Sequence, residues 1–283
     1  MKTCARPGCN EQEWRIDGYC SIYCRDLNEA RADGRALGSG GQETVEDMEA
    51  QFRDLAASAA DAPAVTEGIA VVAVGAGLGI EELLRSMGAS VVRGGQTMNP
   101  SAGEIRAAIE RTGAADVIVL PNNKNIVMAA RQASEGIAQR VRVIETQSVP
   151  QGVAALVALN TELPAEDNAA AMREAAEALR HAEITHAARA TNIHGLHIRA
   201  GQPIGIVDGD LTVAAETIAE AVRAAVRQMI DGRDTALVTL YAGEGEDDAS
   251  AEAIASALRQ EFGVEVDVVP GGQPHYPYLI GAE

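Results

Sequence analysis

The sequence predicts an α/β fold with two related βα halves and mainly parallel sheets. From residue 68 onward, short apolar runs alternate with helical segments, which is the pattern of parallel βα units. Hydrophobic residues make up 47% of the 283 residues, yet only two Phe and one Trp are present. The core is therefore expected to be aliphatic, as it is where helices cover a sheet. A seven-residue pattern that occurs twice indicates that the halves are related.

The first half is expected at about residues 68–160. Its first strand is an apolar run that closes in Gly75-x-Gly77-x-Gly79, a spacing that fits a tight turn better than a dinucleotide fingerprint. Its second helix begins at the capping box Ser101-x-x-Glu104. In chain order we expect a strand at 69–74, a helix at 80–87, a strand at 90–93, a helix at 102–111, a strand at 116–120, a helix at 125–133 and a strand at 141–144.

The second half is expected at about residues 185–283, after an Ala-rich helix at 165–181. Asp208-Gly-Asp210 follows an apolar run, where a turn before a helix is a better interpretation than a magnesium site. His194-x-x-His197 lacks a third metal ligand at helical spacing. The expected elements are strands at 205–207, 237–241 and 264–269, with helices at 214–230 and 249–262.

The repeated pattern is GGQxxxP, present as Gly94-Gly-Gln-Thr-Met-Asn-Pro100 and as Gly271-Gly-Gln-Pro-His-Tyr-Pro277. Both copies follow a strand. Upstream of each copy, an apolar strand closes in a Gly-rich turn and is followed by a helix and a strand. Two related βαβ units are therefore expected.

The N-terminal region is expected to be a separate module. All four cysteines lie within the first 24 residues, and so few apolar residues accompany them that a metal would have to organise the segment. We predict that residues 1–28 bind one structural zinc, with four free or redox-active thiols as the alternative. Residues 29–67 are predicted to hold a Gly-rich linker and an amphipathic helix that begins near Thr44. The proposed zinc ligands are Cys4, Cys9, Cys20 and Cys24.

The charge of the chain excludes some partners. A formal net charge of -18 and a sequence pI of about 4.7 would repel nucleic acid and anionic lipid headgroups. The longest apolar stretches are too short to span a bilayer, and the N-terminus lacks an apolar signal segment. We therefore expect a cytoplasmic protein that neither binds nucleic acid nor inserts into membranes.

Polar loops follow several predicted strands. In a parallel sheet such loops meet at one edge, where ligands bind. The loops at residues 94–101 and 122–125 could form a recognition surface or an anion pocket, or could contain only turn and cap chemistry. The residues expected to bind a partner or ligand are Gly94, Gly95, Gln96, Thr97, Asn99, Ser101, Asn122, Asn123, Lys124, Asn125, Gly271, Gly272 and Gln273.

These segments resemble the C-terminal domain of the A subunit of fatty acid kinase, whose family is related to dihydroxyacetone kinase. The resemblance rests on residues 94–101, then Leu120-Pro-Asn-Asn-Lys-Asn125, Val149-Pro-Gln-Gly152 and 271–280, with a further similarity at residues 45–51. It covers roughly residues 43–283 in family order. The resemblance implies a DegV-like α/β fold. The sequence departs from the family pattern in one respect: we expect the cysteine module to stand in place of the kinase domain.

The resemblance also implies a function. In that family, the C-terminal domain engages a separate fatty-acid-carrying protein of the DegV type. We therefore expect a non-catalytic module that docks such a carrier or a separate kinase subunit. The alternative is an enzyme or sensor that binds a small molecule or acyl phosphate at the strand ends. A homo-oligomer is left open.

Overall fold

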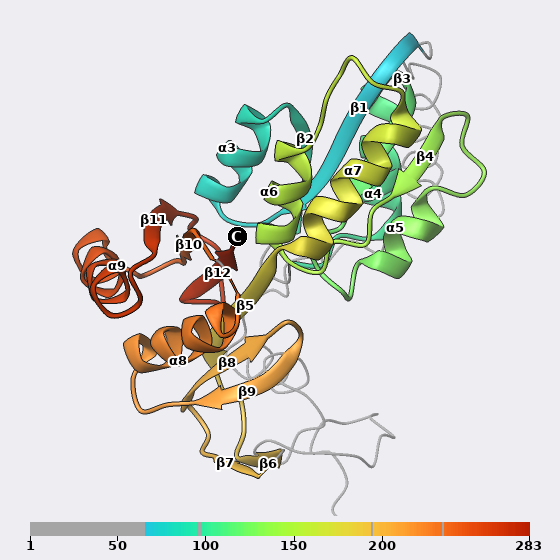
Figure 1. Ribbon diagram of the computed structural model, residues 1–283. Coiled ribbons are helices and arrows are strands. Elements are labelled where there is room, and N and C mark those ends of the chain that lie inside the picture. The colour runs from blue at the N-terminus through green and yellow to red at the C-terminus, as the bar shows by residue number, and fades with distance from the viewer. Residues whose placement is uncertain (1–65, 95–97, 194, 234) are drawn as a thin grey trace, which may run out of the picture. The chain divides into compact units, whose positions relative to one another are not determined.

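The first half of the chain contains a parallel sheet covered by helices on both faces (Figure 1). The computed structural model describes residues 66–94, 98–193, 195–233 and 235–283. Neighbouring strands of the sheet all pair in parallel, in the order β2-β1-β3-β4. The strands are β1 (Thr66–Gly75), β2 (Ala89–Arg93), β3 (Ala114–Leu120) and β4 (Arg140–Val143).

Alternation along the strands gives each face its own core. Val117 and Val119 of β3 pack with one set of helices, whereas Ile118 and Leu120 face the other set. The first set is α4 (Ala102–Thr112) and α5 (Val127–Ala133). The second set is α3 (Leu78–Ser86), α6 (Val149–Val157) and α7 (Ala165–Ala178).

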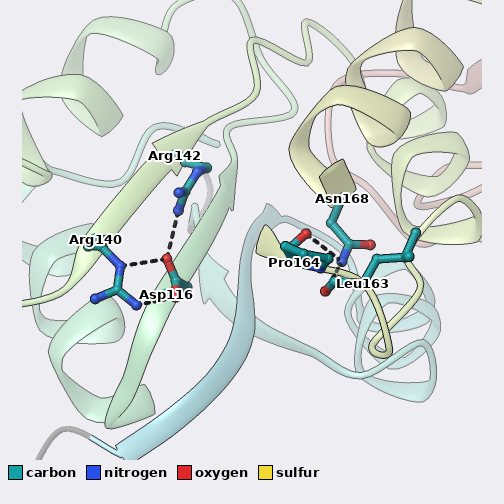
Figure 2. A network of polar contacts seen from close by, with 6 residues as sticks. All are labelled: Asp116, Arg140, Arg142, Leu163, Pro164 and Asn168. Carbon is teal, nitrogen blue, oxygen red and sulfur yellow. Dashed lines mark hydrogen bonds and ion pairs between the residues drawn. The ribbon is translucent and has the colours of Figure 1, made fainter. Parts of the chain in front are cut away.

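Polar contacts fix the part of this half near the amino end of β3 (Figure 2). Asp116 of β3 accepts hydrogen bonds from Arg140 at 2.6 and 3.0 Å and from Arg142 at 2.8 Å. These guanidinium groups, Arg140 above all, lower the pKa of the Asp116 carboxyl. Asn168 of α7 is fully buried and donates to the carbonyl oxygens of Leu163 and Pro164. The turn before α7 is thereby closed.

The second half contains a six-stranded sheet in the order β11-β10-β12-β5-β8-β9. Helices α8 (Ile218–Ile230) and α9 (Asp248–Phe262) pack on one face of it. From the other face, Tyr241 and Leu279 enter the core of the first half. The strands are β5 (Arg180–His186), β8 (Pro203–Val207), β9 (Asp210–Ala214), β10 (Leu237–Ala242), β11 (Glu265–Pro270) and β12 (Tyr278–Ala282), with a separate hairpin of β6 (Thr191–Ile193) and β7 (Leu196–Ile198).

The predicted α/β class and the alternation of the first half are confirmed, but the second sheet is mixed rather than mainly parallel. Only β10 and β11 pair in parallel, and the other four pairings are antiparallel. The predictions missed α6 and five strands, β5, β6, β7, β9 and β12. The Ala-rich helix ends at Ala178, and β5 follows it, while α8 begins only at Ile218.

The turn at Asp208 explains why a strand, β9, follows β8 where a helix was predicted. Asp208 and Gly209 have φ angles of 49° and 89°, and Val207 pairs with Asp210 across them. Positive φ at both central residues is the geometry of a two-residue hairpin turn, which Asp-Gly favours. The turn interpretation is confirmed, but the turn leads into a strand instead of a helix.

The predicted zinc module at residues 1–28 lies outside the described residues, so its four cysteine ligands stay a prediction. The linker and helix predicted at 29–67 also lie outside the described residues, apart from the last two residues of that range, where β1 begins at Thr66. The described residues belong to one compact unit, Ala62–Glu283. None of the helices in these residues is long and apolar enough to cross a bilayer.

Candidate functional site

The carboxyl ends of β1, β2 and β3 lie at one edge of the parallel sheet, as expected. The loops that follow these strands bring together many of the predicted site residues. Gly95, Gln96 and Thr97 fall outside the described residues. We call the exposed or partly exposed side chains of these loops the strand-end edge, which comprises Leu78, Asn99, Ser101, Asn123, Lys124, Asn125 and Met128.

Asn122 lies beneath this edge and holds it in place. Only 6% of the residue is exposed, and its φ angle is 54°. Its Nδ2 donates to the carbonyl oxygen of Val74 at 2.9 Å, and its Oδ1 accepts from the Thr146 hydroxyl at 2.8 Å. Asn122, predicted above to bind a partner or ligand, is buried instead, because its amide matches buried backbone and side-chain groups that the sequence does not place beside it.

Of the next three residues, Lys124 and Asn125 are exposed and Asn123 is partly exposed. The side chain of Asn123 accepts a hydrogen bond from the Asn125 amide at 2.9 Å, and its carbonyl oxygen accepts from the Ile126 amide at 3.0 Å. These bonds close a turn whose tip carries Lys124 and Asn125, both exposed. The loop is therefore fixed at both ends, while the two side chains at its tip face solvent.

The N-terminus of α4 is satisfied from within the chain. The Ser101 hydroxyl accepts from the Glu104 amide at 3.2 Å, and the Glu104 carboxylate accepts from the Ser101 amide at 2.7 Å. This confirms the predicted capping box. The Ser101 amide also lowers the pKa of Glu104. An external anion would have to compete with this carboxylate for the positive end of the helix.

The second GGQ copy is part of a contact between the halves. The carbonyl oxygen of Gly271 accepts from the Ile80 amide at 3.1 Å, and Gln273 is fully buried. The Gln273 Nε2 donates to the carbonyl oxygens of Tyr241 at 2.7 Å and of Tyr276 at 3.1 Å. We call the contact between residues 77–80 and 270–273 the inter-half joint. Of the predicted glycines there, Gly271 is buried and Gly272 is exposed.

Glycines make this approach feasible. Gly77 has a φ angle of 102°, which supports the tight-turn interpretation, and a Cβ there would lie 2.6 Å from the carbonyl carbon of Gly272. A Cβ at Gly79 would lie 2.8 Å from the carbonyl carbon of Pro270 and closer still to its oxygen. The second copy of the repeat therefore takes part in the inter-half joint, whereas Gly95 and Gln96 of the first copy lie outside the described residues.

Titratable side chains of β5 face the first half, and sequence reasoning missed them. Burial raises the pKa of Glu183, and Lys124 partly offsets this rise. His181 is 6% exposed, and its burial lowers its pKa; its Nδ1 has no partner among the described residues. Asp208 accepts a hydrogen bond from the His181 amide at 3.0 Å and pairs with Arg180. In the described part of the chain, no three side chains of metal-ligating type come together.

Two large apolar side chains stand on the strand-end edge. Leu78, the first residue of α3, is 73% exposed, and Met128, the second residue of α5, is 70% exposed. Between the described loops, the cavity lined by Val74, Asn122 and Ile126 measures only about 10 Å³, which is room for about one water.

A family model for the FakA-like C-terminal domain, the C-terminal region of the A subunit of fatty acid kinase and similar proteins, matches residues 70–283. The chain belongs to this family. The matched range contains both sheets, the strand-end edge and the inter-half joint. The resemblance of the loop segments to this family is thereby confirmed for this part of the chain.

Relatives with this C-terminal region are longer proteins. Protein YloV of Bacillus subtilis is 38% identical over 225 residues, which is 79% of this chain and 40% of the relative. An uncharacterized protein of Staphylococcus epidermidis is 36% identical, over 76% of this chain and 39% of its own length. The chain thus spans about two fifths of the length of these curated relatives.

Solved structures show the same fold at low sequence identity. A DegV family protein of Corynebacterium glutamicum gives a TM-score of 0.54 at 16% identity, covering 76% of this chain and 96% of that one. DegV of Bacillus subtilis, described as a fatty acid binding protein, gives 0.53 at 14%, covering 77% and 99%. Dihydroxyacetone kinase of C. freundii gives 0.53 at 12%, covering 76% and 48%. The predicted DegV-like fold is confirmed.

Proposed function

We propose that this member of the FakA-like C-terminal family is a non-catalytic docking module. Its partner is a fatty-acid-carrier protein of the DegV type or a separate kinase subunit. The proposal extends the family assignment, because one subunit of a kinase works together with other chains. The docking surface is the strand-end edge; Gly95, Gln96 and Thr97, which were also predicted to bind a partner or ligand, lie outside the described residues.

The observation that carries the proposal is the exposure of Leu78 and Met128, which lie in the first turns of α3 and α5, after the carboxyl ends of β1 and β3. An exposed Leu or Met side chain contributes binding energy when a partner removes its apolar surface from water. The neighbouring Asn123 and Asn125 can pair with partner groups without the cost of burying a charge. Methionine adapts its shape and is common at binding surfaces.

Two observations favour docking over the small-molecule alternative. The N-terminus of α4, which would attract a phosphate, already has its Ser101 amide bonded to the carboxylate of Glu104. The cavity of about 10 Å³ at the strand ends is far smaller than the roughly 300 Å³ at which ligand pockets begin. A protein partner that covers the strand-end edge from outside needs neither a free helix N-terminus nor a pocket.

Calorimetric titration of the whole chain with the purified DegV-type carrier, and separately with the kinase subunit, tests the proposal. Leu78→Ser combined with Met128→Ser should weaken binding by about tenfold or more, the size of a modest interface hot spot. Val157→Ser is the matched control, because Val157 is 74% exposed but ends α6, which begins at the strand-end edge and runs away from it. All variants should melt close to the wild type.

Two results would contradict parts of the proposal. Equal binding by the double variant and the control would remove the strand-end edge from the interface. A rise in melting temperature with nucleotides, acyl phosphates or fatty acids alone would instead support the small-molecule alternative.

A further inference from the structure

The outer edge of the second sheet is formed by β11, the first strand in the order β11-β10-β12-β5-β8-β9 (Figure 1). Among the described strands, β11 pairs with β10 alone. An edge strand presents backbone N–H and C=O groups to which a strand of another chain can pair. A groove of about 440 Å³ lies beside this edge, lined by Arg259 and residues 263–267. The edge is therefore accessible from solvent.

Alternation along β11 identifies the backbone groups that face outward. The Glu265 amide donates to the carbonyl oxygen of Ala236, the residue before β10, at 3.0 Å, so the backbone groups of Glu265 point to β10. In a strand, the backbone groups of successive residues point to opposite sides. Val266 and Val268 therefore direct their N–H and C=O groups away from β10. Pro270 is the next residue in this series and has no N–H.

Arg259 of α9 occupies one of these outward groups. Its Nε donates to the carbonyl oxygen of Val266 at 3.2 Å, and its Nη2 donates to the same oxygen. Its Nη1 donates to the carboxylate of Glu252, earlier in α9, at 2.6 Å. The guanidinium is thus held across the edge by an anchor on the helix. Another strand can bond to this carbonyl oxygen only after a hydrogen bond from a charged donor has been broken.

The side chains of β11 add a second obstacle to pairing. Glu265 and Asp267 are both exposed on this strand. If two β11 strands paired antiparallel, with Val266 bonded to Val268 of a second copy, Asp267 would lie directly opposite the Asp267 of that copy. Like charges in such opposed positions destabilise a strand pair. Charge and the Arg259 contact therefore act in the same direction.

We propose that Arg259 closes the β11 edge against strand addition, and that the strand it excludes is β11 of a second copy of this chain. A second copy fits this edge because both copies offer the same outward groups. Two antiparallel β11 strands would join the two six-stranded sheets across a two-fold axis. Arg259 thus maintains a closed edge, and its removal opens the edge to self-association. Neither the strand-end edge nor the docking function takes part in this contact.

Sedimentation velocity of the whole chain over a range of concentrations tests this role, in about 1 M salt, where the Debye length is about 3 Å and like charges are screened. Arg259→Ala should self-associate at a concentration at least about tenfold lower than wild type, the effect of one hydrogen bond to a charged group. Arg259→Lys, which keeps a charged donor, should restore most of this difference. Arg223→Ala is the matched control, because Arg223 of α8 pairs with Glu261 of α9 at 3.5 Å and forms no hydrogen bond with β11 among the described residues.

A second variant locates the contact on β11. Val268→Pro removes an outward N–H and leaves the bonds to β10 in place. Arg259→Ala combined with Val268→Pro should therefore self-associate no more than wild type. Hydrogen exchange of Arg259→Ala, followed by mass spectrometry, provides the same information without the proline. The amides of β11 should exchange more slowly at a concentration where this variant associates than at high dilution.

Three results would overturn the proposal. If Arg259→Ala associates at the same concentration as wild type and only melts earlier, Arg259 merely fastens α9 to β11. Association that persists in the double variant, with unchanged exchange of the β11 amides, places the contact elsewhere on the chain. An equal gain of association in Arg223→Ala would show that the loss of any positive charge has this effect.

Discussion

Replacing Gly79 with alanine should destabilise the chain, because the two halves touch at this residue without room for a side chain. A Cβ at Gly79 would lie 2.8 Å from the carbonyl carbon of Pro270 and 3.3 Å from the Cα of Gly271. These are backbone atoms, so no side chain can rotate away. Residues 77–80 would have to move away from residues 270–273, and the bond from the Ile80 amide to the Gly271 oxygen would break.

The size of the effect follows from three contributions. Alanine in place of glycine favours a helix by up to about 1 kcal/mol. The lost hydrogen bond costs about 1 kcal/mol, and the overpacked contact costs about 1–3 kcal/mol. The free energy of unfolding should therefore fall by about 1–3 kcal/mol, the sum of these contributions.

Gly103→Ala is the matched control. Gly103 is the second residue of α4, as Gly79 is the second residue of α3, but a Cβ at Gly103 has the Ser101 hydroxyl at 3.9 Å as its nearest neighbour. The control should be stabilised by up to about 1 kcal/mol. Urea unfolding followed by circular dichroism measures both variants. If Gly79→Ala gained as much stability as Gly103→Ala, the close approach at the inter-half joint would be refuted.

Three further predictions concern other parts of the chain. Elemental analysis of the purified protein should find about one zinc per chain, and changing all four cysteines to serine should abolish it; metal-free wild type would refute the N-terminal zinc site. Asn122→Ala should lower the free energy of unfolding by about 1–3 kcal/mol, because buried groups of Val74 and Thr146 lose their partner, whereas exposed Asn125→Ala should change it by less than about 0.5 kcal/mol. Burial raises the pKa of Glu183 above 4.5 in the folded state, so the folded chain holds this proton more tightly than the unfolded chain. The contribution of Glu183 to stability is therefore lost as the pH rises through the folded pKa. Glu183→Gln should therefore gain stability relative to wild type at pH 7.5 but not at pH 4, and an equal difference in calorimetric scans at both values would contradict this sign.

The sequence by itself determined the features that depend on neighbours along the chain. Apolar runs alternating with helices specified the parallel sheet of the first half, because each βα unit buries its own strand. The capping box at Ser101 and the turn at Asp208 were predictable for the same reason, since both use groups within a few residues. The family's motifs then indicated the DegV-like fold.

Only the tertiary structure decided which segments become neighbours across the chain. β12 enters between β10 and β5 and makes the second sheet mixed, and no local pattern specifies such a pairing. In the second GGQ copy, Gly271 and Gln273 are buried at the inter-half joint, which the letters of the motif do not indicate. Glu183 of β5 lies on the side of the second sheet that faces the first half. Burial and electrostatic fields depend on distance in space, and the periodicity of a sequence records only distance along the chain.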